Sequence, residues 1–341
     1  MRRPSPGSKL LPATEAGARW ERRIEILLLL GAVSLPALVS RYELQLFTLI
    51  GIFCILALSL DLVWGYGGIL DLGRAVLFGW PAYVAALLAT RAGITNGLLV
   101  IPLSVLFGAA LALLASLPLF LGQRQYRGIF IAMATLVFAY ASERTAIVWP
   151  EVGSANGIPN IPLMSLAPLV GTPVSPGLVF YVIVVILVVL IYVFLKWLVN
   201  SQFGLVLASA RDRDRRVTFL GYNTSRFRLA IYTLSGAIAG AGGALYAFHE
   251  GYVAPDVLGV NLSTQALLWV LIGGRGKLLG ALVGTIAMNF ISTQLSGAFQ
   301  IVWQIILGLL LVVLLTTLPD GITGLLLRRK SSDFGQRGQM P

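Results

Sequence analysis

Few side chains in this chain have the chemistry that catalysis or metal binding requires. His249 is the single histidine and Cys54 the single cysteine, so the composition excludes a cluster of histidine ligands and an intramolecular disulfide. His249 and Glu250 are an acid–base pair by type, but no Ser or Cys nucleophile motif accompanies them. The stretch GGRGK at 273–277 is followed by Leu278 and lacks the spacing of a phosphate-binding P-loop. We therefore predict a protein that is not itself an enzyme, uses no cofactor or metal and binds no ATP through such a loop.

Two acids, Asp61 and Glu143, fall within otherwise apolar segments. Ionisable side chains are costly inside a membrane and are kept there either for pairing or for a role in a transport pathway. The sequence leaves both interpretations open, and the two acids are pathway candidates. Asp71 and Arg74 are three residues apart, a spacing that lets them pair at the start of a helix.

The most highly charged internal stretch is 201–228, which interrupts a hydrophobic sequence. Ala208–Phe219 is expected to form a helix that Gly221 ends. A short helix of this kind would project below the membrane and could transmit force between subunits; the alternative is an ordinary solvated basic loop. The residues that we expect to couple the chain to a partner are Arg211, Asp212, Arg213, Asp214, Arg215, Arg216, Leu220 and Gly221.

The elements that position these residues are hydrophobic helices. Of the 341 residues, 57% are hydrophobic and 11% are charged, whereas soluble proteins carry about 25% charged residues. The sequence predicts an all-α polytopic membrane protein, in which each straight span needs about 20 apolar residues. The ten candidate spans are 24–40, 46–64, 75–90, 97–121, 128–149, 177–198, 229–248, 262–273, 278–295 and 299–318. The eighth span is too short to cross straight and is expected to be a half-helix broken by the glycines that follow it.

The basic residues predict the orientation. With the N-terminus and C-terminus both inside, 21 of the 25 Lys and Arg residues fall in inner segments and only Arg41 and Arg91 in outer ones. Positive charge accumulates on the cytoplasmic side of membrane proteins. This bias explains the net charge of +11 better than binding to nucleic acid does.

Three regions follow from this topology. We predict a basic cytoplasmic segment at 1–23, a transmembrane domain at 24–327 that contains the cytoplasmic loop 201–228, and a disordered cytoplasmic tail at 328–341. The run 24–40 is expected to be a retained span, because no small-x-small cleavage site follows it.

Two further patterns bear on packing. The outer loop 150–176 is rich in Pro, Gly, Ser and Asn, and it is either a re-entrant plug or an ordinary surface loop. Small residues four apart, at Gly236 and Gly240 and again at Gly280 and Gly284, predict helices that approach each other closely.

Several motifs, in order along residues 45–326, resemble one family. ARDRDRRVTFLGYNTSRFRLAIYTLSGAIAGAGGALYA resembles the coupling-loop region of permease subunits of ATP-binding-cassette importers for branched-chain amino acids and related amides, including urea. ALSLDLVWGYGGILDLGRAVLFGWPAY, YRGIFIAMATLVFA, SANGIP, LIGGRGKLLGALVG and LPDGITGLL resemble its other segments. The chain departs from the family where Asp71-Leu72-Gly73-Arg74 replaces the common Ser-Leu-Gly-His, and where Pro81 interrupts the next helix.

The resemblance, to the second or M-type permease, implies an importer with several partners. The partners are two cytoplasmic ATPases that dock on Arg211–Gly221, a second and related permease, and a periplasmic or extracellular solute-binding protein. The resemblance also implies a location in the bacterial cytoplasmic membrane. The matched outer loop adds Asn156 and Gly157 to the pathway candidates. The solute implied is a small molecule without net charge, either a branched-chain amino acid or urea and short amides.

Two other classes of protein remain as alternatives. A carrier or channel that acts alone would place functional acids deep in its spans and need no ATPase. A membrane-embedded enzyme would need a nucleophile or metal set, which the sequence lacks.

Overall fold

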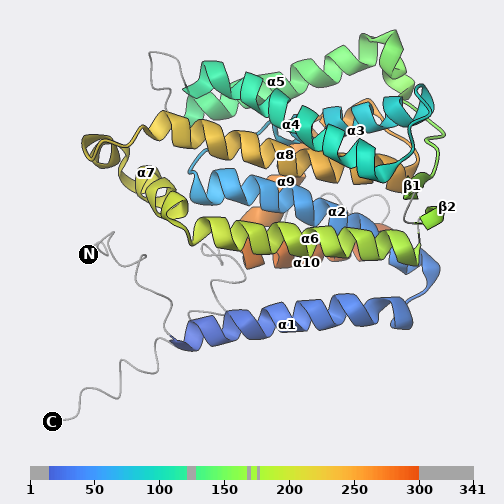
Figure 1. Cartoon of the computed structure of the whole chain (residues 1–341), viewed down its shortest axis with the longest axis horizontal. Helices are drawn as coiled ribbons and strands as arrows, with labels where there is room; N and C mark the ends of the chain where they lie inside the picture. Colours follow the sequence, from blue (N-terminus) through green and yellow to red (C-terminus); the bar gives the residue numbers. More distant parts are fainter. Residues whose placement is uncertain (1–14, 121–127, 167–169, 175–176, 299–341) are drawn as a thin grey trace.

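The chain is a bundle of helices that lie side by side, most of them along one direction (Figure 1). A computed structural model describes residues 15–120, 128–166, 170–174 and 177–298. Its α-helices are α1 (Glu15–Leu38), α2 (Arg41–Asp61), α3 (Arg74–Thr90), α4 (Gly97–Phe120), α5 (Gly128–Val148), α6 (Leu178–Val199), α7 (Gln202–Phe219), α8 (Thr224–Glu250), α9 (Val260–Gly273) and α10 (Leu278–Ala298). The architecture confirms an all-α polytopic membrane protein.

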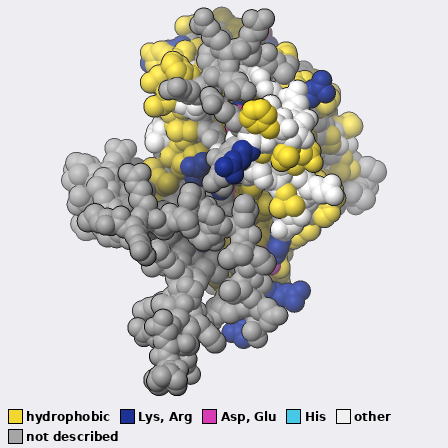
Figure 2. All heavy atoms as spheres, turned by 90° about the vertical axis from the view of Figure 1, so that its left-hand side faces the viewer, with side chains coloured by type: hydrophobic (Ala, Val, Ile, Leu, Met, Phe, Trp, Pro, Cys, Tyr) yellow, Lys and Arg dark blue, Asp and Glu magenta, His cyan; other side chains and the backbone are white. Residues whose placement is uncertain are grey.

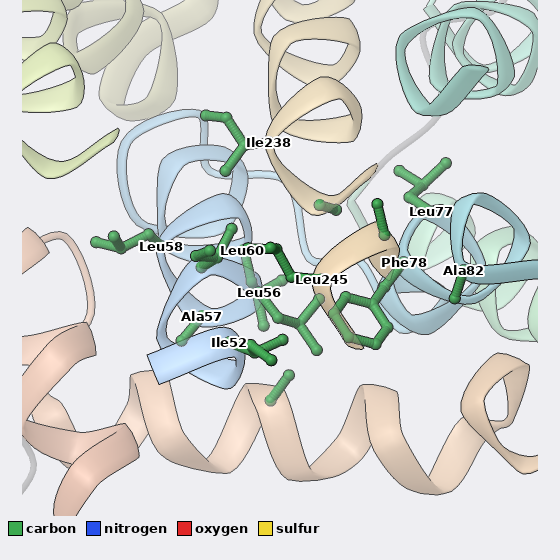
Figure 3. Close-up of a cluster of buried hydrophobic side chains, with 14 of the residues drawn as sticks. Ile52, Leu56, Ala57, Leu58, Leu60, Leu77, Phe78, Ala82, Ile238 and Leu245 are labelled. Carbon is green, nitrogen blue, oxygen red and sulfur yellow. The ribbon is translucent and has the colours of Figure 1, made fainter. Parts of the chain in front are cut away.

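The hydrophobic core is built around α2 and α8. Figure 3 shows side chains from α2 packed against α3 and α8, with Leu56, Phe78 and Leu245 near its centre. Each of these three side chains is fully buried. Cys54 also lies in this part of α2 and is 3% exposed. These helices are therefore interior elements, whereas α4 and α6 leave most of their residues on the surface of the bundle.

Small residues set how closely α8 approaches its neighbours. A Cβ on Gly236 would lie 2.3 Å from the Cβ of Ala112 in α4, and one on Gly243 would lie 2.0 Å from the backbone oxygen of Phe78 in α3. A Cβ on Gly284 would lie 2.1 Å from the backbone oxygen of Trp269. Both pairs of small residues that the sequence singled out therefore act in helix packing, the first between α8 and α4 and the second between α10 and α9.

Three breaks separate consecutive long helices inside the bundle. The first, 67–73, joins α3 to the π-helical turn η1 (Leu62–Tyr66) that continues α2. The second, 251–259, contains the short helix η4 (Pro255–Leu258) and leads into α9. The third, 274–277, joins α9 to α10 at an angle of 116°. Backbone amides and oxygens that leave a helix lose their partners within it, so each break needs partners from elsewhere in the chain.

The helices coincide with nine of the ten predicted spans. Among the described residues, five helices are long and apolar enough to cross a membrane alone, namely α2, α4, α5, α6 and α8. The number of crossings rises to six if the bent pair of α9 and α10 counts as one span. The 14 residues of α9 reach only about 21 Å, as expected of a half-helix. α3 is also short, with 17 residues. The predicted span 299–318 lies outside the described residues.

The outer loop contains a hairpin that the sequence did not predict. Strand β1 (Met164–Leu166) pairs with β2 (Val170–Val174) in the antiparallel sense, and two turns of 3-10 helix precede them, η2 (Pro150–Val152) and η3 (Ser154–Asn156). Met164 is fully buried and lies against Gly97 at the start of α4. Figure 1 shows the hairpin at the end of the bundle opposite α7, so this part of the loop covers the outer helix ends.

The first helix is attached to the bundle through polar side chains of α6. The hydroxyl of Tyr181 donates to the backbone oxygen of Ala32 at 2.8 Å. Glu25 accepts from Tyr192 at 2.6 Å and pairs with Lys196 at 2.5 Å. Figure 1 shows α1 set apart from the other helices, beside α6. These contacts fix α1 at Glu25, where its apolar half begins, and at Ala32, near the middle of that half.

Replacing Gly236 with Val should separate α4 from α8, because the new side chain would overlap Ala112. We expect Gly236→Val to lower the free energy of unfolding by about 1–3 kcal/mol, the usual cost of overpacking. Gly31→Val is the matched control, since a Cβ on Gly31 meets nothing within 4 Å. The measurement is thermal unfolding of the purified variants in one detergent, and equal melting temperatures would contradict the packing described.

Candidate functional site

The charged stretch between α6 and α8 folds as the helix α7. It spans Gln202–Phe219, so it begins six residues before the predicted start at Ala208 and ends at the predicted residue. The earlier start follows from Ser201, whose extended backbone places it as the N-cap. At the other end Gly221 has φ +87°, and the amides of Gly221 and Tyr222 donate to the oxygens of Thr218 and Val217. This is the Schellman arrangement, which only a residue tolerant of positive φ allows.

The tip of α7 presents apolar side chains to solvent. Phe219 is 89% exposed and Leu220 is 76% exposed, and a Cβ on Gly221 would meet nothing within 4 Å. Figure 1 shows α7 projecting at the end of the bundle opposite the β-hairpin. Figure 2 looks onto this end, where Lys and Arg side chains stand out among hydrophobic and neutral ones. The tip is therefore a small apolar surface on a basic face.

The predicted coupling residues have different surroundings. Arg211 reaches inward and donates from Nη1 to the backbone oxygen of Gly65. Asp214 pairs with Arg228 at the start of α8, at 3.1 Å. Arg216 is exposed. The backbones of Asp212, Arg213 and Arg215 lie in α7, but their side chains fall outside the described part. Two of the charges thus hold α7 against the membrane domain.

A set of contacts that we call the inner polar cluster joins three parts of the chain. It consists of Asp61, Trp64, Gly65, Arg211, Arg275 and Gly276. Asp61 is fully buried, and its Oδ1 accepts from the amide of Gly276 at 2.7 Å. Arg275 donates from Nε and Nη2 to the backbone oxygen of Trp64 at 3.1 and 2.9 Å, and its guanidinium lies 4.9 Å from the indole ring centre.

The local backbone explains why these groups meet. A π-helical turn shifts the hydrogen bonding at a helix end, and in η1 the oxygens of Trp64 and Gly65 accept from arginine side chains. Space is tight, since a Cβ on Gly65 would lie 2.6 Å from the amide nitrogen of Gly276. Arg211 therefore bonds α7 to the end of α2, which in turn is bonded to the turn between α9 and α10.

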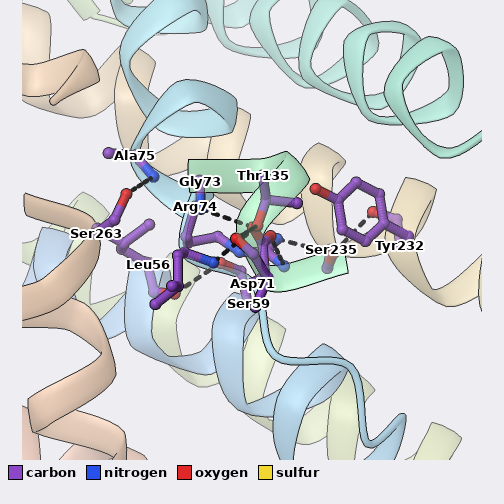
Figure 4. Close-up of polar contacts among 12 residues, drawn as sticks. Leu56, Ser59, Asp71, Gly73, Arg74, Ala75, Thr135, Tyr232, Ser235 and Ser263 are labelled. Carbon is purple, nitrogen blue, oxygen red and sulfur yellow. Dashed lines mark hydrogen bonds and ion pairs between the residues drawn. The ribbon is translucent and has the colours of Figure 1, made fainter. Parts of the chain in front are cut away.

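A second polar region, which we call the buried polar centre, lies at the break before α3 (Figure 4). Asp71 and Arg74 form an ion pair at 2.9 Å with both side chains fully buried, so the pairing expected from their spacing is confirmed. Arg74 also donates from Nη1 to Ser235 in α8 at 2.9 Å. The hydroxyls of Thr135 in α5 and Ser263 in α9 accept from the amides of Leu72 and Ala75, at 3.1 and 3.0 Å.

The other pathway candidates lie in separate places. Glu143 in α5 is half-buried, and a Cβ on Gly259 would lie 3.1 Å from its Oε2. Gly157 is buried with φ +66°, next to Val253, and the backbone oxygen of Asn156 accepts from Tyr252 at 3.0 Å. Asn156 and Gly157 thus hold the outer loop against the turn after α8. Neither of them contacts Asp61 in the inner polar cluster.

The sequence did not predict which residues bond to one another in the inner polar cluster and in the buried polar centre. It did not connect Arg275 to Trp64, or Ser235 and Thr135 to the break before α3. The available signal was the presence of Arg, Ser and Thr within or beside apolar spans, where each polar group needs a partner. Within the described residues there is no group of three or more His, Cys, Asp or Glu side chains that could hold a metal ion.

Together, the bundle and its projecting helix define a multi-pass membrane protein with a rigid attachment point on one face. Residues 42–315 match the family model described as "Branched-chain amino acid transport system / permease component". The chain belongs to this family, and it is a permease subunit of the ATP-binding-cassette importer class. No solved structure gives a significant match.

Three relatives show how far the similarity extends. The chain is 28% identical to the high-affinity branched-chain amino acid transport system permease protein LivM of Escherichia coli, over 92% of this chain and 77% of the relative. It is 23% identical to a probable LivM of Methanocaldococcus jannaschii, over 80% of this chain and 90% of the relative. A probable LivH from the same organism is 26% identical, over 43% and 49% of the two chains.

The contact between α7 and the membrane domain can be tested at Gly68. A Cβ there would lie 2.5 Å from Cγ of Arg211, and Gly68 has φ +71°. Gly68→Ala should therefore loosen α7 in addition to straining the turn, at a further cost of about 1–3 kcal/mol. Amide hydrogen exchange over 202–219 in the purified protein should become faster.

Gly93→Ala is the matched control for backbone strain. Gly93 has a similar φ of +66°, but a Cβ there meets nothing within 4 Å. Exchange over 202–219 should stay at the wild-type rate in this variant. Equal exchange in the two variants would show that Arg211 does not hold α7 against Gly68.

Proposed function

We propose that the chain is one of two permeases in an ATP-driven importer of branched-chain amino acids, located in the bacterial cytoplasmic membrane. The observation that carries the proposal is the projecting helix α7 with its exposed apolar tip, in a chain whose residues 42–315 match the permease family. A transport subunit without an ATP-binding loop needs a separate ATPase, and the basic end of the bundle is where a cytoplasmic protein can reach it.

The docking element in this proposal is the tip of α7, formed by Phe219, Leu220 and Gly221. Exposed apolar side chains on an otherwise polar face mark interaction sites, and the Schellman end keeps them in one conformation. Arg216 adds an exposed positive charge beside the tip. Arg211 and Asp214 act behind the tip, since they bind Gly65 and Arg228 and so transmit its displacement to the membrane domain.

The substrate class is supported by the relatives and by the charge of the interior. LivM proteins named for branched-chain amino acid transport align with most of this chain. The ion pair of Asp71 and Arg74 has no net charge, as a zwitterion has none. The second permease is a related chain, as the partial match to a LivH protein suggests, and a solute-binding protein delivers the amino acid to the outer loop.

The proposal predicts ATP-dependent uptake by the assembled transporter. Proteoliposomes with this chain, its partner permease and the ATPase should import radiolabelled leucine when ATP and the binding protein are present, and should stop when ATP is omitted. Uptake of urea in place of leucine would overturn the substrate assignment. Leucine transport by the isolated chain without ATP would overturn the importer assignment.

The docking surface predicts a separate effect of Leu220→Asp. Because Leu220 is 76% exposed, the substitution should change the free energy of unfolding by no more than about 0.5 kcal/mol, while it places a buried charge in the interface. We expect the ATPase to be lost from the purified complex. Leu163→Asp, a change at a 44% exposed residue of the outer loop, should retain it, and retention by both variants would exclude the tip as the docking surface.

A further inference from the structure

The buried polar centre lies level with the middle of two helices long enough to cross a membrane, so Arg74, which the charge count had assigned to an inner segment, lies deeper than predicted. Ser235, which accepts from Arg74, is close to the midpoint of α8 (Thr224–Glu250), and Thr135 is close to the midpoint of α5 (Gly128–Val148). Both helices are long and apolar enough to cross alone. Asp71 and Arg74 are therefore held at a depth where neither water nor lipid headgroups can solvate them.

The pair is incompletely satisfied at that depth. Oδ1 of Asp71 accepts from the amide of Gly73 at 2.9 Å, and Oδ2 faces Arg74. Nε of Arg74 has no hydrogen-bond partner among the described residues, although the side chain is fully buried. Figure 4 shows the guanidinium and carboxylate facing one another among side chains from α5, α8 and α9. The guanidinium is already held by Asp71, by Ser235 and by the ring of Tyr232, whose centre lies 5.5 Å away, so Nε is the donor that remains open to a further acceptor.

The backbone around the pair has the features of a solute site. The stretch 67–73 is non-helical, and Arg74 is the first residue of α3, whose N-terminus carries partial positive charge. Membrane transporters bind small solutes where helices are interrupted near the midplane, with helix N-termini towards anionic groups. The backbone oxygen of Leu56 accepts from Ser59 in the view of the buried polar centre (Figure 4), and the side chain of Leu56 lies in the apolar core (Figure 3), so the polar centre borders that core.

We infer that Asp71 and Arg74 form a transient binding site for a zwitterionic α-amino acid, and that the ion pair opens to exchange partners with it. The ammonium group of the solute binds Asp71, its carboxylate binds Arg74, and its aliphatic side chain lies towards Leu56. The inference rests on the proposed import of branched-chain amino acids and adds the residues that receive the solute inside the membrane.

The electrostatics favour a ligand with both charges. Parting the two side chains in a low-dielectric interior is costly unless each charge gains a new counter-ion. A zwitterion supplies both counter-ions and keeps the net charge of the site at zero. A carboxylate alone or an amine alone leaves one buried charge unpaired, and urea offers no charge to either side chain. The closed ion pair thus also seals the pathway when no solute is present.

The test uses the complex of this chain with its partner permease and ATPase in lipid nanodiscs. Leucine should raise the melting temperature of the complex, whereas leucinamide, which lacks the carboxylate, and 4-methylpentanoate, which lacks the amine, should not. The double variant Asp71→Asn with Arg74→Gln removes both charges together, so it leaves no unpaired charge to unfold the protein. It should show no shift with leucine and at least a tenfold loss of leucine uptake in proteoliposomes.

Ser116→Ala is the matched control, because among the described residues the buried hydroxyl of Ser116 bonds within its own helix, to Leu113. It should keep the leucine shift and the wild-type uptake. If the double variant binds and imports leucine as the wild type does, the pair is purely structural and the inference fails. Equal stabilisation by the two analogues would also overturn it. Failure of the wild-type complex to import leucine would instead refute the proposed function.

Discussion

The structure depends on the need to satisfy every backbone polar group without water. Helices do so internally, but this chain interrupts its helices at 67–73, 251–259 and 274–277. Two of the breaks are bonded to side chains of distant helices: Thr135 and Ser263 accept from amides at the first, and Asp61 accepts from the amide of Gly276 in the third. The second is held by the outer loop, where Ile158 and Val253 exchange backbone hydrogen bonds. Polar side chains are therefore concentrated where the backbone requires them.

This arrangement connects α7 to the interior of the bundle through hydrogen bonds. α7 is rigid at its tip and bonded through Arg211 to the end of α2. The same end of α2 is bonded through Trp64 and Asp61 to the turn between two helices that meet at a sharp angle. Close packing of α8 on α4 and α3 leaves the central helices little freedom to absorb a displacement. Hydrogen bonds and close packing thus link α7 to the broken helices, as the coupling role proposed for it requires.

The sequence predicted what depends on neighbours along the chain. Hydrophobic runs located the helices, Gly221 predicted the end of α7, and paired small residues predicted close packing. It did not predict contacts that join residues far apart, such as Asp61 with Gly276, 215 positions away, or Arg74 with Ser235, 161 positions away. Those contacts depend on how the helices are arranged in space. The β-hairpin was missed for a related reason, since its short strands pair only over the helix ends that support them.

The position of Cys54 has a practical consequence for studying movement in this protein. It is the single thiol of the chain and lies within the packed interior of α2, where a polar maleimide reagent cannot reach it in the folded state. The native protein therefore already has a background suited to site-specific labelling. A cysteine introduced at the tip of α7 and another in the outer loop would carry the only reactive groups, and spectroscopic distances between such labels could follow the two faces through a transport cycle.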